Sequence, residues 1–103
     1  MIEKGEWGIV GMGIMGTSLS RNFISHGFKL SLYNRYVKGK EEKVALEIAQ
    51  KYGILDKCIA FESLEDFVKS INIPRKLILM LPAGETIDEI LQKLKFYLKK
   101  ETL

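Results

Sequence analysis

Three glycines within six residues, Gly11-Met12-Gly13-Ile14-Met15-Gly16, constrain the fold of this chain more than any other feature. The apolar run Trp7-Gly8-Ile9-Val10 comes just before them, as expected of a buried parallel strand that ends at glycine. After the glycines, apolar residues recur at helical spacing as far as His26, and Gly27 supplies a helix stop. The first quarter of the chain therefore predicts a strand, a tight glycine turn and a helix.

The rest of the sequence continues this alternation. Further strands are expected over residues 28–33, 58–61 and 77–81, and further helices over residues 44–52, 64–71 and 86–98. The third strand is expected at an edge, and the fourth is the clearest buried strand in the sequence. Because crossovers between parallel strands are right-handed, the pattern predicts one α/β domain of the Rossmann type with a doubly wound parallel sheet. The strand order 3-2-1-4 follows by analogy with that class.

Several residues mark where the later helices begin and end. Ser63, with Asp66 at the reciprocal position, is expected to cap the third helix, and Pro74 to end it. Thr86 and Glu89 have the spacing of a capping box for the last helix. The residues of that helix expected to face the core are Ile87, Ile90, Leu91, Leu94 and Leu98.

The glycine turn is expected to hold a phosphate group. A pyrophosphate rests on a helix N-terminus when free backbone N–H groups point at it and no side chain blocks its approach. Gly11 allows a sharp exit from the strand, Gly13 removes a Cβ that would collide with phosphate, and Gly16 lets the helix pack closely. A glycine turn without a ligand is the alternative. The surrounding strand and helix favour a dinucleotide.

The residues after the second strand indicate which dinucleotide is bound. A unit that binds NAD usually has an acid there, which holds the ribose hydroxyls. This chain has Asn34-Arg35, followed by Lys38 and Lys40, with no acid before Glu41. Since a guanidinium pairs with a 2′-phosphate that a carboxylate would repel, this pattern favours NADP over a merely solvated basic loop.

Composition excludes several other classes of protein. The chain is 47% hydrophobic and 28% charged with a net charge of +3, which is ordinary for a globular protein and too weakly basic to indicate nucleic-acid binding. The longest apolar run, residues 77–81, is too short to cross a membrane. The acidic start of the chain does not resemble a signal peptide. The single cysteine, Cys58, fits a reducing cytoplasm.

No residue is a good candidate for catalysis, and none for binding a metal. His26 is expected at the far end of the first helix, and Cys58 has no predicted base nearby. Asp88 and Glu89 are adjacent on a helix and cannot face a common substrate.

The sequence resembles the N-terminal domain of decarboxylating 6-phosphogluconate dehydrogenases. The resemblance covers nearly the whole chain and rests on the glycine turn, on Tyr33-Asn34-Arg35, and on the segment from Pro74-Arg75-Lys76 to Pro82-Ala83-Gly84. It implies an NADP-dependent oxidoreductase of the pentose phosphate pathway and of gluconate utilization. Such an enzyme oxidises 6-phosphogluconate and decarboxylates it to ribulose 5-phosphate without a metal.

Residue by residue, the resemblance implies that residues 11–16 bind the cofactor phosphates. Asn34 and Arg35 would bind the 2′-phosphate with Tyr36 adjoining them, and Leu81, Pro82 and Ala83 would line the nicotinamide side. The chain departs from many members at three positions, where they carry alanine for Gly13, a small hydroxyl residue for Tyr36 and lysine for Pro82. Proline at position 82 also resembles the related 3-hydroxyacid dehydrogenases.

The family's catalytic residues and its helical dimerisation domain would fall beyond residue 103. We therefore expect residues 1–103 to be an incomplete, NADP-binding part of a longer, homodimeric enzyme. Alone, this part should be inactive and prone to self-association. Two alternatives remain, a dehydrogenase of the 3-hydroxyisobutyrate type and a stand-alone nucleotide-sensing module, although such modules usually keep an acid after the second strand.

Overall fold

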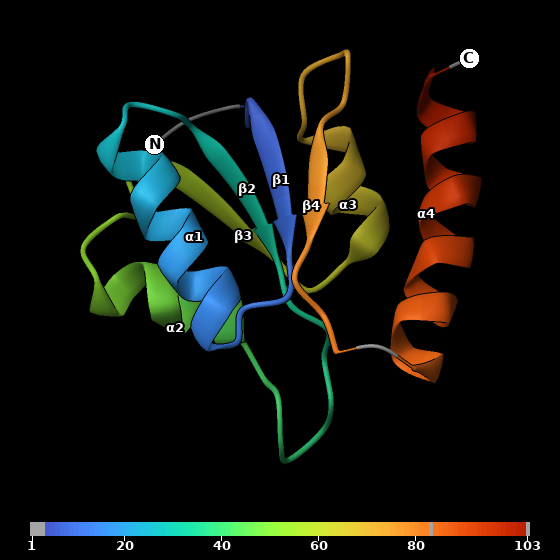
Figure 1. Ribbon diagram of the computed structural model, residues 1–103, viewed down its shortest axis with the longest axis horizontal. Helices are drawn as coiled ribbons and strands as arrows, with labels where there is room; N and C mark the ends of the chain where they lie inside the picture. The colour runs from blue at the N-terminus through green and yellow to red at the C-terminus, as the bar shows by residue number, and fades with distance from the viewer. Residues whose placement is uncertain (1–3, 83, 103) are drawn as a thin grey trace.

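The computed structural model describes residues 4–82 and 84–102, which form a parallel sheet covered by helices on both faces (Figure 1). Its four strands are β1 (Trp7–Val10), β2 (Leu30–Tyr33), β3 (Cys58–Phe61) and β4 (Leu77–Leu79). Their order in the sheet is β3-β2-β1-β4, with every neighbouring pair parallel. The predicted fold class and strand order are confirmed, and β3 lies at an edge as expected.

The helices form two layers around the sheet. Helices α1 (Ile14–Ser25) and α2 (Val44–Lys51) cover one face, and α3 (Leu64–Lys69) and α4 (Glu85–Thr102) cover the other (Figure 1). Successive strand residues point to opposite faces, so Ile9 packs into the core beneath α1 and α2, while Val10 packs into the core beneath α3 and α4. Among the described residues, no helix is long and apolar enough to cross a membrane.

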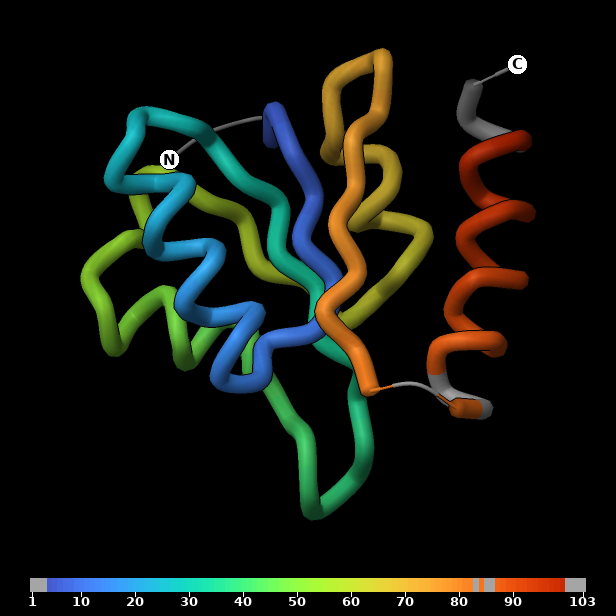
Figure 2. The backbone as a smooth tube through the Cα atoms, in the orientation of Figure 1, coloured from blue at the N-terminus to red at the C-terminus, as the bar shows by residue number. Residues whose placement is uncertain are grey.

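All four strands end at the same edge of the sheet. Val10 is paired with Tyr33 and with Leu79, and Tyr33 is paired with Phe61. The segments that follow the strands therefore leave the sheet side by side. Figure 2 shows the longest of them, between β2 and α2, projecting beyond this edge as a hairpin-shaped loop. In open parallel sheets, ligands bind beyond the carboxyl ends of the strands.

The second strand begins later than predicted because the residues that cap the end of α1 extend as far as Phe28. The N–H of Gly27 (φ +93°) bonds to the carbonyl of Ile24, and the N–H of Phe28 to that of Phe23, which is the Schellman pattern. The rings of Phe23 and Phe28 also meet, with centroids 5.5 Å apart. Phe28 thus belongs to the helix stop, and β2 starts at Leu30.

Two predictions for the second half of the chain are wrong. The helix α3 ends at Lys69, well before Pro74, so the proline does not end it. The strand β4 stops at Leu79, and its residues are half-buried, not fully buried, because β4 lies at the other edge of the described sheet.

The start and the inner face of α4 also differ from the prediction. The helix begins at Glu85, and the Asp88 N–H bonds to the Gly84 carbonyl at 3.3 Å, so Thr86 is not its cap. Ile90 and Leu94 are buried as expected, whereas Leu91 is 40% exposed. Helix α4 packs mainly on α3 (Figure 1), and Ile90 and Leu94 join the core cluster that contains Val10 of β1 and Tyr33 of β2.

Candidate functional site

The glycine turn connects β1 to α1 at the carboxyl edge of the sheet. Gly11 has φ +99°, and a Cβ there would lie 2.5 Å from the Met80 carbonyl oxygen, so only glycine fits without strain. The first bond of α1 runs from the Thr17 N–H to the Gly13 carbonyl, at 2.9 Å. The amides of residues 14–16, which come before this bond, therefore have no partner within the helix.

Gly13 and Gly16 meet very different surroundings. A Cβ on Gly13 would have no atom within 4 Å. A Cβ on Gly16 would overlap the Gly11 carbonyl oxygen. Gly16 is therefore required for α1 to approach β1, whereas Gly13 borders open space in front of the helix.

The start of α1 has unused hydrogen-bond donors and no negative charge to balance its helix dipole. Among the described residues, no side chain accepts a hydrogen bond from its first amides, and its first turn contains no acidic residue. Because a helix N-terminus carries partial positive charge and free N–H donors, this arrangement suits an anion.

Two of the cavities that border the turn also reach the residues that follow β4. The first has a volume of about 230 Å³ and lies between the turn and the ends of β2 and β4; its lining includes Met12, Gly13, Tyr33, Asn34, Arg35, Glu41, Leu81 and Pro82. The second has a volume of about 460 Å³ and is lined mainly by apolar residues, which are Ile14, Met15, Leu79, Met80, Leu81 and Pro82, with Gly13 and Gly16. Ile14 is 89% exposed beside it. The site thus offers a polar compartment and an apolar one.

Asn34 links the end of β2 to the glycine turn. Its Oδ1 accepts a hydrogen bond from the Met12 N–H at 2.9 Å, and its Nδ2 donates to the Arg35 carbonyl and to Glu41 Oε1, both at 3.1 Å. The side chain is buried. Asn34 thereby holds the turn in place.

Arg35 is the cation nearest to the turn in the polar cavity. Its Nε donates to Glu41 Oε2 at 2.9 Å, and both side chains are partly exposed. From the sequence, Glu41 was expected only as the first acid after the strand, and its contact with Arg35 was not predicted. The only hint of this contact in the sequence was Gly39, because a glycine can adopt the φ of +77° with which the loop turns back.

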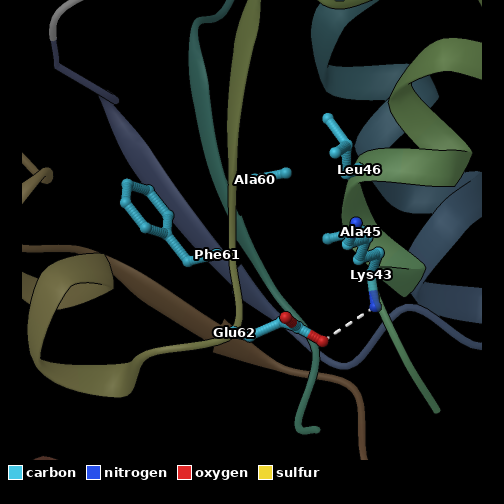
Figure 3. Close-up of a pocket in the computed structure, with 6 residues that line it drawn as sticks. All are labelled: Lys43, Ala45, Leu46, Ala60, Phe61 and Glu62. Carbon is cyan, nitrogen blue, oxygen red and sulfur yellow. Dashed lines mark hydrogen bonds between the residues drawn. The ribbon is translucent and has the colours of Figure 1, made fainter.

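Glu62 fixes the other end of this loop. Its Oε2 accepts a hydrogen bond from the Lys43 N–H at 2.7 Å, at the start of α2 (Figure 3). A separate cavity of about 210 Å³ lies here, between α2 and the edge strand β3. Ala60 faces Leu46 across it, while Phe61 points to the other side of the sheet (Figure 3). The contact ties the end of the loop that carries Arg35 to the segment between β3 and α3.

The remaining predicted residues differ in whether they line the two cavities. Leu81 and Pro82 line both cavities, whereas Tyr36 is 53% exposed and lines neither. Ala83 lies outside the described residues. Lys38 and Lys40 are exposed on the projecting loop.

The two described groups whose pKa is raised, Tyr33 and Cys58, are poorly suited to proton transfer at neutral pH. Burial raises the pKa of the Tyr33 phenol above its usual 10.0, although Arg35 opposes the rise. Burial also raises the pKa of the Cys58 thiol to about 11, and its Sγ donates to the Ile54 carbonyl. His26 lies at the opposite end of α1 from the turn, as predicted. No cluster of metal-ligating side chains occurs among the described residues.

Comparison with known proteins agrees with this geometry. Residues 6–103 match the family model described as the NAD binding domain of 6-phosphogluconate dehydrogenase. The decarboxylating 6-phosphogluconate dehydrogenase of Chlamydia pneumoniae is 39% identical over 92 residues, which are 89% of this chain and 18% of that protein. The NADP(+)-dependent decarboxylating enzyme of Bacillus subtilis (strain 168) is 34% identical over 102 residues, which are 99% of this chain and 20% of that protein.

A solved structure gives the same result. The 6-phosphogluconate dehydrogenase of Plasmodium falciparum, described in its apo form and in complexes with its cofactor NADP+ and its substrate 6-phosphogluconate, superimposes with a TM-score of 0.72. It is 25% identical, and the match covers 89% of this chain and 19% of that one. The chain thus spans about a fifth of the length of these relatives. It belongs to the family of NAD-binding domains of 6-phosphogluconate dehydrogenase.

Proposed function

We propose that this chain binds NADP as the cofactor domain of an enzyme that oxidises and decarboxylates 6-phosphogluconate to ribulose 5-phosphate. The observation that carries the proposal is the uncapped start of α1, where Gly13 leaves room for a phosphate next to a cavity that contains Arg35. NADP would supply the acceptor for the hydride removed from the substrate. The relatives described above support this substrate over 3-hydroxyisobutyrate and over a stand-alone sensing role.

The polar cavity and the apolar cavity would each hold the part of the cofactor that matches its own polarity. The amides at the start of α1 would hold the pyrophosphate. Arg35 would pair with the 2′-phosphate of the adenosine in the polar cavity, while Asn34 keeps the turn in shape. Leu81 and Pro82, in the apolar cavity, would lie along the nicotinamide and exclude water from it. Tyr36 and Ala83 would complete the adenosine and nicotinamide ends, as the family resemblance implies.

We further propose that residues 1–103 contribute cofactor binding only. Hydride transfer needs a substrate held over the nicotinamide with an acid or base at its hydroxyl. Among the described residues, the titratable groups whose pKa is shifted, Tyr33 and Cys58, are both shifted away from neutral pH. Substrate binding and dimerisation would then depend on further parts of a longer enzyme, and the isolated chain would be inactive and would self-associate through the open edge of β4.

The proposed setting is the pentose phosphate pathway, including gluconate utilization, in the cytoplasm. The unpaired, buried thiol of Cys58 supports a reducing compartment.

Calorimetric titration of the chain with 2′,5′-ADP and with 5′-AMP at low salt tests the proposal. Two charged hydrogen bonds to the 2′-phosphate predict at least a roughly tenfold preference for 2′,5′-ADP, which weakens as salt is added. The variant Arg35→Ala should lose most of this preference. Lys57→Ala removes the same charge at the amino end of β3 and should keep it. Equal affinities of the unmodified chain for the two nucleotides would contradict the proposal.

A further inference from the structure

We propose that Glu41 is a positioning residue of the 2′-phosphate site, which fixes the Arg35 guanidinium and connects it to the glycine turn. This inference rests on the proposed function, because it concerns how the same site distinguishes NADP from NAD. It assigns a favourable role to a carboxylate at a place where a negative charge would otherwise be expected to repel the ligand.

The loop after β2 is folded so that Glu41 returns to the start of that loop. The backbone N–H of Val37 donates to the Glu41 carbonyl, and the N–H of Glu41 donates to the Val37 carbonyl, both at 2.7 Å. The two residues form an antiparallel bridge, with Gly39 in the left-handed region between them. The position of Glu41 is therefore set by the backbone and not by a chance side-chain contact.

The Glu41 carboxylate lies in the middle of a chain of hydrogen bonds. Its Oε2 accepts from Arg35 Nε at 2.9 Å, and its Oε1 accepts from Asn34 Nδ2 at 3.1 Å. Asn34 Oδ1 in turn accepts from the Met12 N–H at 2.9 Å. Glu41 thus connects the cation of the polar cavity to the backbone of the turn that faces the pyrophosphate.

The geometry leaves the phosphate-binding edge of Arg35 available. The contact with Glu41 uses Nε, and within the described part of the chain no other hydrogen bond to the guanidinium is formed. The two Nη groups form an edge with which arginine can bind a phosphate bidentately. Since the pair is partly exposed, it adds little to the stability of the fold. Its effect is to hold one conformer of a flexible side chain before the ligand arrives.

This role predicts the sign of the effect when Glu41 is removed. Ordering a free arginine on binding costs affinity, so Glu41→Ala should lower the preference for 2′,5′-ADP over 5′-AMP by about three- to tenfold. If Glu41 acted mainly by repelling the 2′-phosphate, the same variant would raise this preference. The two roles therefore predict changes in opposite directions.

The experiment is calorimetric titration of both nucleotides into the chain and its variants at constant low salt. Glu47→Ala is the matched control, because it removes an equal charge from an exposed position on α2, outside the loop that carries Arg35 and Glu41. It should not lower the preference. Glu41→Gln keeps one acceptor oxygen for Arg35 and should fall between the unmodified chain and Glu41→Ala. In a chain that already carries Arg35→Ala, removal of Glu41 should lower the preference no further.

The outcomes separate this inference from the proposed function. An unmodified chain with no preference for 2′,5′-ADP would contradict the proposed function. A preference that Arg35→Ala abolishes, but that Glu41→Ala leaves unchanged or raises, would overturn the role of Glu41 and leave the NADP site standing.

Discussion

Helices α1 and α3 both begin just beyond the carboxyl edge of the sheet, yet their first turns are completed in different ways. At α3, Ser63 Oγ accepts a hydrogen bond from the Asp66 N–H, and Glu65 and Asp66 lie in the first turn. At α1, no described side chain accepts from the first amides, and the first turn carries no acid. The chain itself therefore completes the start of α3, whereas the first amides of α1 stay free for the ligand proposed above.

The largest expected effect concerns the support of the α1 start. A Cβ on Gly16 would overlap the Gly11 carbonyl oxygen, which is backbone and cannot move aside without displacing the helix. Gly16→Val should therefore lower the free energy of unfolding by about 3 kcal/mol, measured by urea denaturation. The buried Cys58, whose thiol pKa is about 11, gives a second readout. It should react slowly with a thiol reagent at pH 8 in the unmodified chain and fast in the variant.

The counterpart is Gly13, where the same substitution should affect the ligand and not the fold. Gly13→Val adds a side chain to open space in front of the helix, so the free energy of unfolding should stay nearly constant. Affinity for both 2′,5′-ADP and 5′-AMP should fall at least about tenfold, because charge-assisted hydrogen bonds from the α1 amides are blocked.

Gly13→Ala is the matched control for this variant. Gly13→Ala adds one carbon atom where Gly13→Val adds three, so it should weaken binding of both nucleotides less than Gly13→Val does. If Gly13→Val bound both nucleotides as tightly as the unmodified chain, the open space at α1 would not be a phosphate site. The uncapped start of α1 would then have no functional difference from the capped start of α3.

Much of the fold could be predicted because local chemistry and hydrophobic period agree. The stop of α1 at Gly27 and the cap of α3 at Ser63 depend only on near neighbours in the sequence, and both appear as predicted. Thr86 shows the limit of such local signals. It has the right spacing to Glu89, but the helix starts one residue earlier.

The partners inside the site were harder to predict. Asn34 was expected to face the 2′-phosphate, a role that stays a proposal, and nothing local to it shows that its amide would also support the Met12 N–H. The Arg35–Glu41 pair depends on a turn of the backbone at Gly39. Hydrophobic periodicity identifies this segment only as a loop and does not predict how it turns. Contacts made by irregular backbone are set in three dimensions, so residue spacing alone does not reveal them.

The smallest expected effect is at the start of α3, and it tests the other half of the comparison. Ser63→Ala removes the acceptor for the Asp66 N–H, a bond that is long at 3.4 Å, and leaves that amide to water. The free energy of unfolding should fall by about 0.5–1 kcal/mol, the low end of the range for lost helix caps. Affinity for 2′,5′-ADP should not change, because the α3 start is completed by its own chain and contributes no donor to a ligand. Urea denaturation gives the free energy of unfolding, and calorimetry on the same preparation gives the affinity. A loss of nucleotide affinity larger than the loss of stability would mean that the start of α3 also belongs to the binding site.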